Sequence, residues 1–244
     1  MDQKEANIKQ IIIVTDGKSN VGGDPVSAAK EAYYSNIIVN TIGIIDQRQE
    51  DEGPLAEIVG IAEAGGGLYE YSYIDELYQT MQSLTHKTVN KTIQDAVNKQ
   101  LRDIIGQELD DILPESRSKL LHYIDSYSDV IHLQTCILLD TSGSMAKKIL
   151  SARYSILDLV DSFKARGGRA DIAVITYPGG GGENCKLLFN FDEDLACLEE
   201  RLYTIETKGI TPTGPAIYYA IETMKNYDKK NIGKEILELE GGLG

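Results

Sequence analysis

The stretch that decides the fold is ILLDTSGSM, at residues 137–145. The apolar run that leads into it, residues 135–139, predicts a buried strand. This run ends at the carboxylate of Asp140, and the hydroxyl residues Ser142 and Ser144 follow at alternate positions. Alternate residues of an extended turn point to the same side, so the three side chains can converge on one point. A helical pattern comes next, which completes a predicted strand, polar turn and helix.

The three side chains of this turn offer only oxygen atoms. Oxygen donors without an imidazole or a pair of thiolates nearby suit Mg²⁺ or Mn²⁺ rather than Zn²⁺. The start of a helix would also favour negative charge there, because its first N–H groups are free. The alternative is that Ser142 or Ser144 only caps that helix. A single serine would favour the cap, whereas the complete stretch favours a metal site.

At these residues the chain resembles the von Willebrand factor A (vWA) domains, whose metal-ion-dependent adhesion site carries D-x-S-x-S after a central strand. That family adds a threonine from a second loop, and Thr211 stands at the matching place in GITPTGPAI, residues 209–217. It also adds an aspartate at the end of another strand, and Asp16 ends IIIVTDG, residues 11–17, in this way. The resemblance therefore implies a metal site formed by Asp140, Ser142, Ser144, Thr211 and Asp16.

The order of these motifs differs from the usual pattern of the family. In ordinary vWA domains the T-D-G strand follows the other two motifs, whereas here it comes first, as in a small group of similar bacterial proteins that includes cytoplasmic ones from spore-forming Firmicutes. The resemblance implies one circularly permuted domain in which Asp16 and Asp140 face each other across 124 positions of sequence. A rival arrangement pairs two half-domains between chains as a swapped dimer. We favour the single chain, because ends that lie close together make permutation easy.

Apolar runs and amphipathic segments alternate along the chain. This pattern predicts an α/β fold with a doubly wound, mostly parallel, Rossmann-like sheet flanked by helices. The predicted strands are residues 10–15, 37–45, 68–73, 130–139, 170–177 and 185–191, the last of them antiparallel. The predicted helices are residues 24–34, 55–63, 146–164, 194–205 and 214–227, with a long and a short helix between residues 74 and 128.

These elements predict four regions of the chain. Residues 1–74 would be the second half of a vWA domain, residues 75–129 a helical linker, and residues 130–230 the first half of the same domain. Residues 231–244 are acidic and then glycine-rich, and we expect a tail with a mobile end.

Composition narrows the class of partner and the location. A chain of 244 residues that is 42% apolar can form one substantial core. Its formal net charge of −14 argues against nucleic acid or an anionic membrane as the partner. The odd number of cysteines, 3, without CxxC spacing predicts reduced thiols in a cytoplasmic protein. The polar first residues predict no signal peptide, and no apolar run reaches the length of a membrane span.

The resemblance also implies a function. In the family, the two serines of D-x-S-x-S bind the cation directly and the two aspartates act through water, while the threonine binds directly or through water, depending on the state of the site. A cation held by few direct anions favours a carboxylate from a partner at its vacant position. We therefore predict a non-enzymatic adaptor or scaffold that captures an acidic residue of a protein partner.

Two other functions stay open at this stage. The metal could be purely structural in a scaffold, or the chain could be a metal-assisted hydrolase. The sequence DTSGS superficially resembles the D-x-D-x-T pattern of haloacid-dehalogenase phosphatases, but Ser142 stands where the second aspartate is needed. Neither Ser142 nor Ser144 lies in a G-x-S-x-G pattern. No residue is therefore predicted to be catalytic.

Overall fold

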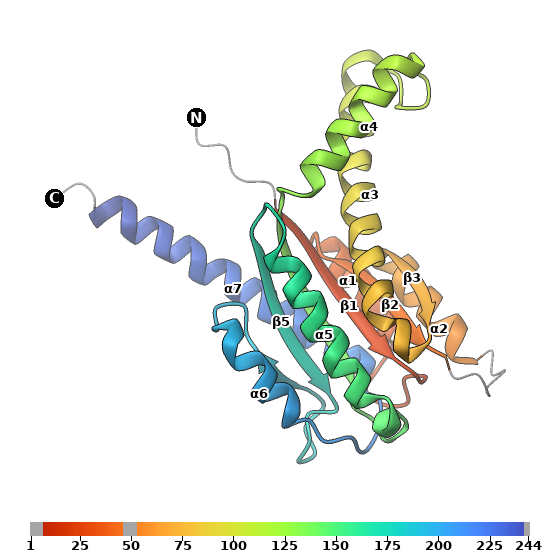
Figure 1. The fold of residues 1–244 in the computed structure, drawn as a ribbon, viewed down its shortest axis with the longest axis vertical. Coiled ribbons are helices and arrows are strands. Elements are labelled where there is room, and N and C mark those ends of the chain that lie inside the picture. Colours follow the sequence, from red (N-terminus) through yellow and green to blue (C-terminus); the bar gives the residue numbers. More distant parts are fainter. Residues whose placement is uncertain (1–6, 46–52, 242–244) are drawn as a thin grey trace.

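A computed structural model of the chain describes residues 7–45 and 53–241, with side chains described for residues 7–45 and 56–231 (Figure 1). Within these residues one sheet of six strands has the order β3-β2-β1-β4-β5-β6. Neighbouring strands from β3 to β5 are parallel, and β6 is antiparallel to β5. The strands are β1 Asn7–Thr15, β2 Ile38–Ile44, β3 Gly66–Ser72, β4 His132–Asp140, β5 Ala170–Tyr177 and β6 Lys186–Phe189. The predicted α/β fold with a mostly parallel sheet is confirmed.

Helices cover both faces of the sheet (Figure 1). The α-helices are α1 Pro25–Tyr34, α2 Gly53–Ala64, α3 Leu77–Ile105, α4 Pro114–Ser128, α5 Ile149–Lys164, α6 Leu198–Tyr203 and α7 Thr213–Gly241. Short 3-10 helices are η1 Ile74–Glu76, η2 Gly143–Lys147 and η3 Leu195–Cys197. Asp24 caps α1 with its carboxylate, which accepts hydrogen bonds from the N–H groups of Val26 and Ser27, and Pro25 takes the first position of the helix.

Two apolar clusters fill the space between the sheet and the helices. One joins α3, α5 and α6 to one face and contains Met81, Ile156 and Leu202. The other joins α1, α2 and α7 to the opposite face and is rich in alanine, including Ala28 and Ala220. Small side chains allow α1 and α7 to approach closely on that face. Burial on both faces explains why the central strands read as continuous apolar runs.

The centre of the sheet is the pair β1 and β4, which come from opposite halves of the sequence. Their register aligns Ile11 with Cys136 and Val14 with Leu139, so both strands end at the same edge of the sheet. The chain leaves β1 towards β2 on one side and leaves β4 towards β5 on the other. Doubly wound sheets bind ligands at such a switch point, beyond the carboxyl ends of the strands.

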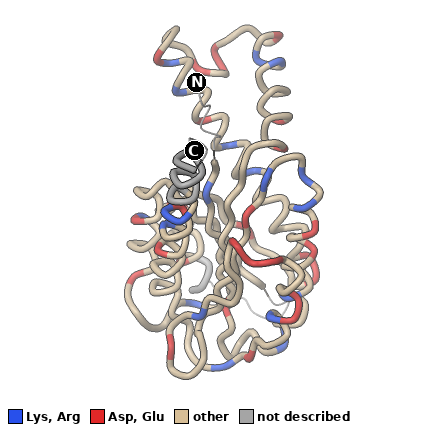
Figure 2. The backbone as a smooth tube through the Cα atoms, turned by 90° about the vertical axis from the view of Figure 1, so that its left-hand side faces the viewer, with Lys and Arg blue, Asp and Glu red and all other residues tan. Residues whose placement is uncertain are grey.

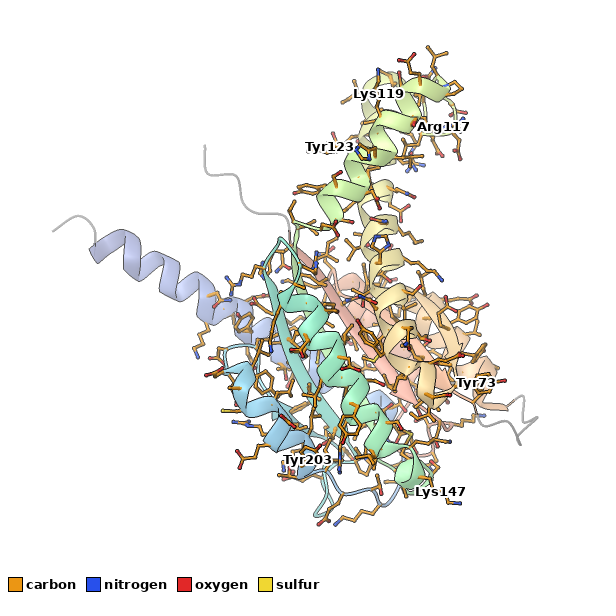
Figure 3. All side chains as sticks on the ribbon, viewed as in Figure 1. Tyr73, Arg117, Lys119, Tyr123, Lys147 and Tyr203 are labelled. Atoms are coloured by element: carbon orange, nitrogen blue, oxygen red, sulfur yellow. The ribbon has the colours of Figure 1, made fainter. Side chains whose placement is uncertain are left out.

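Helices α3 and α4 form a hairpin that projects from the body, and Figure 3 shows Arg117, Lys119 and Tyr123 on this projecting part. The buried residues of α3 all lie between Leu77 and Ile93, within the first 17 of its 29 residues. The long and short helices predicted for this region are confirmed. Gly106, with φ of 71°, ends the long one in the left-handed conformation that glycine adopts easily.

Two helices differ from the prediction at their ends. The helix expected from residue 146 begins at Ile149, because residues Gly143–Lys147 form a 3-10 turn first. The last helix was predicted to end near residue 227 with a tail from residue 231, but α7 continues to Gly241. Lysine, glutamate and leucine after Gly233 favour helix, which offsets the roughly 1 kcal/mol that one glycine costs. The expected mobile end at residues 242–244 lies outside the described residues.

Acidic and basic residues are interspersed along the backbone in the view of Figure 2. The three cysteines, Cys136, Cys185 and Cys197, are free thiols. Within the described part of the chain, no helix combines the length and apolar character needed to cross a lipid bilayer.

Candidate metal site

Asp140 is the last residue of β4, and its side chain is fully buried at the switch point. Its Oδ2 accepts a hydrogen bond of 2.6 Å from the hydroxyl of Thr15 at the end of β1. Its Oδ1 accepts one of 2.8 Å from the N–H of Ser142. A carboxylate that binds the N–H two residues further on forms an Asx turn. This turn, residues 140–144, is called the serine turn here. It leads the chain out of the strand and sets the direction of the Ser142 and Ser144 side chains.

The two serine hydroxyls connect Asp140 to Asp16. The Oγ atoms of Ser142 and Ser144 lie 3.1 Å apart, and Ser144 Oγ donates to Asp16 Oδ1 at 2.7 Å. Ser142 stands at the N-cap position of η2, but its hydroxyl forms no capping hydrogen bond, and neither serine is the N-cap of α5. The structure thus brings four of the five candidate side chains into one continuous network from two neighbouring strands.

Thr141 holds the turn to the rest of the site through its backbone and hydroxyl. Its N–H donates to the carbonyl of Tyr177 at 2.8 Å, and its hydroxyl donates to the carbonyl of Pro178 at 3.0 Å. Its own carbonyl accepts from the N–H of Lys208 at 2.9 Å. These contacts fix the serine turn against β5 and against the loop that leads to Thr211.

Thr211 is buried, and its backbone is bound to the loop that follows Asp16. Its N–H donates to the side-chain carbonyl of Asn20 at 2.9 Å, and its carbonyl accepts from Ser19 Oγ at 3.2 Å. These hydrogen bonds tie the Thr211 loop to the loop that follows Asp16. Among the described residues, the hydroxyl of Thr211 forms no hydrogen bond with the other four candidate side chains, so Thr211 is linked to the loop after Asp16 and is not part of the network.

Lys148 belongs to the site although sequence reasoning missed it. Its Nζ lies 2.6 Å from Asp16 Oδ2, and the Asp16 side chain is only 1% exposed. The available signal was the spacing of four residues after Ser144, but Lys147 and Lys148 are adjacent and the sequence does not say which of them turns inward.

Tyr177 was also missed, because it looks like the end of an ordinary apolar strand. The register pairs it with Asp140, and its ring is fully buried. Its hydroxyl lies near Thr15 and Thr213, but no described atom forms a hydrogen bond of good geometry with it. Burial and the nearby carboxyl of Asp140 raise the pKa of Tyr177 far above its ordinary value. Only the strand register reveals this neighbour.

The electrostatics of Asp140 fit a nearby cation. Burial raises the pKa of Asp140 to about 6, although hydrogen bonds from Thr15 and Ser142 oppose this rise. No Lys, Arg or His whose side chain is described forms an ion pair with Asp140. A buried carboxylate without a cationic partner is costly, and a divalent cation would supply that partner.

The donor set also fits a hard cation. The network offers hydroxyl and carboxylate oxygens, which Mg²⁺ and Mn²⁺ prefer, and the ammonium of Lys148 shows that positive charge is accommodated there. Across the described residues, no three His, Cys, Asp or Glu side chains gather as a metal cluster. The site differs from such clusters because serine hydroxyls provide part of its donors. The role of the five residues as metal ligands stays a prediction.

Comparisons with known proteins agree with this geometry at the level of the fold. The chain is 38% identical over 213 residues to the uncharacterized protein YabS of Bacillus subtilis (strain 168), covering 86% of each. It is 35% identical over 88 residues to YwmC of the same organism, which spans 34% of this chain and 37% of YwmC. Neither description names an enzymatic activity.

A solved structure shares almost the whole architecture. The crystal structure of an uncharacterized protein from Alicyclobacillus acidocaldarius subsp. acidocaldarius DSM 446 has a TM-score of 0.83 and 36% sequence identity. The match covers 92% of this chain and 96% of that chain. The model of the von Willebrand factor type A domain matches residues 1–87, which hold Asp16 but not the serine turn. Together with the matching fold, these likenesses show that the chain belongs to the von Willebrand factor type A domain family.

Proposed function

We propose that this chain is a non-enzymatic, divalent-cation-dependent protein-binding module. It would hold Mg²⁺ or Mn²⁺ at the switch point and capture an acidic residue of a protein partner. The proposed ligands are Asp140, Ser142, Ser144, Thr211 and Asp16. The observation that carries this proposal is the hydrogen-bonded chain from Ser142 through Ser144 to Asp16, which joins the ends of β4 and β1.

The exposure of the residues indicates where a partner would approach. Asp140 and Ser142 are buried, whereas Ser144 is exposed, so the network opens to solvent on the Ser144 side. A bound cation would supply an electrophilic centre for a carboxylate there. Thr15 and the N–H of Ser142 hold Asp140 in place. Removal of the partner's carboxylate from the cation would cost about 2–5 kcal/mol of binding, as for one partner of a buried charge contact.

The location of the histidines supports binding rather than catalysis. His132 begins β4 at the opposite end of the strand from Asp140, and His86 and His122 lie on α3 and α4. None of the three forms a hydrogen bond with either serine hydroxyl, as a general base would. We also propose a cytoplasmic location and a single-chain, monomeric domain, which the free thiols and the pairing of β1 with β4 support.

Thermal unfolding tests the metal site directly. The chain is melted in EDTA and then with Mg²⁺ or Mn²⁺, beside Ser142→Ala, Thr211→Ala and Asp140→Asn. A ligand that binds only the folded state adds about 2.7 kcal/mol at a hundredfold excess over Kd. We expect a metal-dependent rise in Tm that the three variants lose. Ser126→Ala, on the distant α4, is the matched control and should keep it.

A second experiment separates capture of a partner from a structural metal. The chain is immobilised, exposed to cell extract with Mn²⁺, and eluted with EDTA. We expect bound protein that EDTA releases and that Ser142→Ala does not retain. A metal-dependent Tm without EDTA-sensitive capture would favour the structural metal, whereas hydrolysis of a phosphoester that Asp140→Asn abolishes would favour the hydrolase.

A further inference from the structure

The ammonium of Lys148 donates a hydrogen bond to one carboxylate oxygen of Asp16, and Asp16 is a proposed metal ligand. Its Nζ lies 2.6 Å from Asp16 Oδ2, while Oδ1 of the same carboxylate accepts from Ser144. The side chain of Lys148 is 15% exposed and that of Asp16 is 1% exposed. A contact this buried is screened by water and salt far less than a surface ion pair.

The backbone of the serine turn delivers this ammonium into the site. The N–H of Lys148 donates to the carbonyl of Met145 at 2.8 Å, and its carbonyl accepts from the N–H of Ala152 at 3.0 Å. Lys148 is therefore fixed between η2 and the first turn of α5. Its neighbour Lys147 carries the same charge but is exposed, and Figure 3 shows it at the surface of the molecule.

The charges make Lys148 a competitor of a divalent cation. Among the residues with described side chains, Lys148 is the only cationic one that forms an ion pair with Asp16 or Asp140. A cation at the serine hydroxyls would bring a second positive charge to Asp16, where the ammonium already lies, and two positive charges at that range repel each other.

We propose that Lys148 sets the affinity of the site for divalent cations. Its ammonium and the cation are alternative partners of Asp16, so the site binds a cation more weakly than its oxygen donors alone would allow. This inference rests on the proposed metal site and names the residue that regulates it.

The test is the Kd for Mn²⁺, measured from the electron paramagnetic resonance signal of free Mn²⁺ at constant pH and ionic strength. We expect Lys148→Met to bind Mn²⁺ at least tenfold more tightly than the unchanged chain. Lys148→Arg keeps the positive charge and should stay within threefold. Lys147→Met removes the same charge from the exposed neighbour and should also stay within threefold.

The possible results separate this inference from the metal site itself. If the unchanged chain binds Mn²⁺ and Lys148→Met binds it no more tightly, the inference is wrong and the metal site stands. If neither folded protein binds Mn²⁺, the metal site and the inference are both wrong. Lys148→Gln repeats the measurement with a polar side chain, so that the result does not depend on how well one variant folds.

Discussion

At the scale of single residues, Asp140 shows how local chemistry prepares the site. Its carboxylate accepts from the N–H of Ser142, two residues further on, and this contact needs only neighbouring residues. The second oxygen is satisfied by Thr15, which lies 125 positions away in sequence. The local sequence is therefore sufficient to form the turn, whereas its attachment to β1 depends on how the sheet is assembled.

Gly22 provides a test of how the Asp16 and Thr211 loops fit together. A Cβ at Gly22 would lie 2.5 Å from Cγ of Pro215, whereas one at Gly23 would meet no atom within 4 Å. Both glycines have positive φ, which costs other residues about 1–2 kcal/mol. Overpacking adds about 1–3 kcal/mol at Gly22 alone. We expect Gly22→Ala to lower the free energy of unfolding in urea by about 2–5 kcal/mol.

Gly23→Ala is the matched control, because it carries the conformational cost without the clash. It should lower the free energy of unfolding by about 1–2 kcal/mol. Only Gly22→Ala displaces Pro215, so it should also weaken Mn²⁺ binding. Equal losses of stability in the two variants would contradict the tight packing of the two loops.

The lowered pKa of Asp171 predicts how the free energy of unfolding depends on pH. Burial alone would raise the pKa of its carboxyl, but hydrogen bonds from His132 and Arg169 and their charges lower it below the ordinary value. A carboxyl whose pKa is lower in the folded state contributes stability above its unfolded pKa. This contribution is lost as pH falls below about 4.

We expect Asp171→Asn to lower the free energy of unfolding at pH 7 by about 1–3 kcal/mol. The free energy of unfolding of this variant should also fall less steeply as the pH is lowered. Urea unfolding between pH 7 and the acid limit of folding measures both effects. Asp161→Asn removes an exposed carboxylate that pairs with Lys164 and is the control. A variant as acid-sensitive as the unchanged chain would show that Asp171 does not carry this dependence.

At the scale of elements, α3 has two parts with different roles. Its first half packs on the sheet, and Thr88 donates to the buried side chain of Asn40 at 3.0 Å. Asn40 in turn donates to Gln10 at 3.0 Å, which ties the helix to β2 and β1. The second half leaves the body with α4, and exposed apolar residues such as Ile104 and Leu113 lie near its tip.

Two leucines on this hairpin should differ strongly in their contribution to stability. Leu84 is fully buried on the first half of α3, whereas Leu121 on α4 is 40% exposed. We expect Leu84→Ala to cost about 2–5 kcal/mol and Leu121→Ala to cost less than about 1 kcal/mol. Chemical unfolding of both variants measures the difference. Equal costs would mean that the projecting half is as well packed as the first half.

At the scale of the whole molecule, one sheet unites the two halves of the sequence. Strands β1 to β3 come from the first half and β4 to β6 from the second, and they meet only at the pair β1 and β4. An ion pair between Lys9 and Asp228 places the start of β1 beside α7. We propose that the chain is a circularly permuted vWA domain. In the usual order of the family, α7 would lead directly into β1, and the two segments lie side by side here.

A chain returned to the usual order tests this proposal. Residue 231 is joined to residue 7 by a short flexible linker, and the chain is opened between α3 and α4, at residues 107–113. We expect it to fold with one cooperative transition and to lose about 1–2 kcal/mol, a fall in Tm of roughly 2–8 °C for this size. The control is the original order ending at residue 231. A rearranged chain that does not fold would contradict the permutation.

The sequence by itself determined the elements and the type of chemistry. Apolar runs in β1, β2, β4 and β5 are buried on both faces, so their strand character is local and strong. The oxygen side chains of ILLDTSGSM and TDG follow strands at fixed positions, and parallel strands share one edge. The resemblance to vWA domains, in which the T-D-G and D-x-S-x-S strands are neighbours, then placed Asp16 beside Asp140, Ser142 and Ser144.

The tertiary structure decided which other groups reach that edge. The contact of Thr15 with Asp140, the inward turn of Lys148 and the burial of Tyr177 beside Asp140 all depend on strand register and on the path of η2. The projection of α3 depends on which of its residues pack against the sheet. These features depend on contacts between residues that are distant in sequence, and local propensity does not determine such contacts.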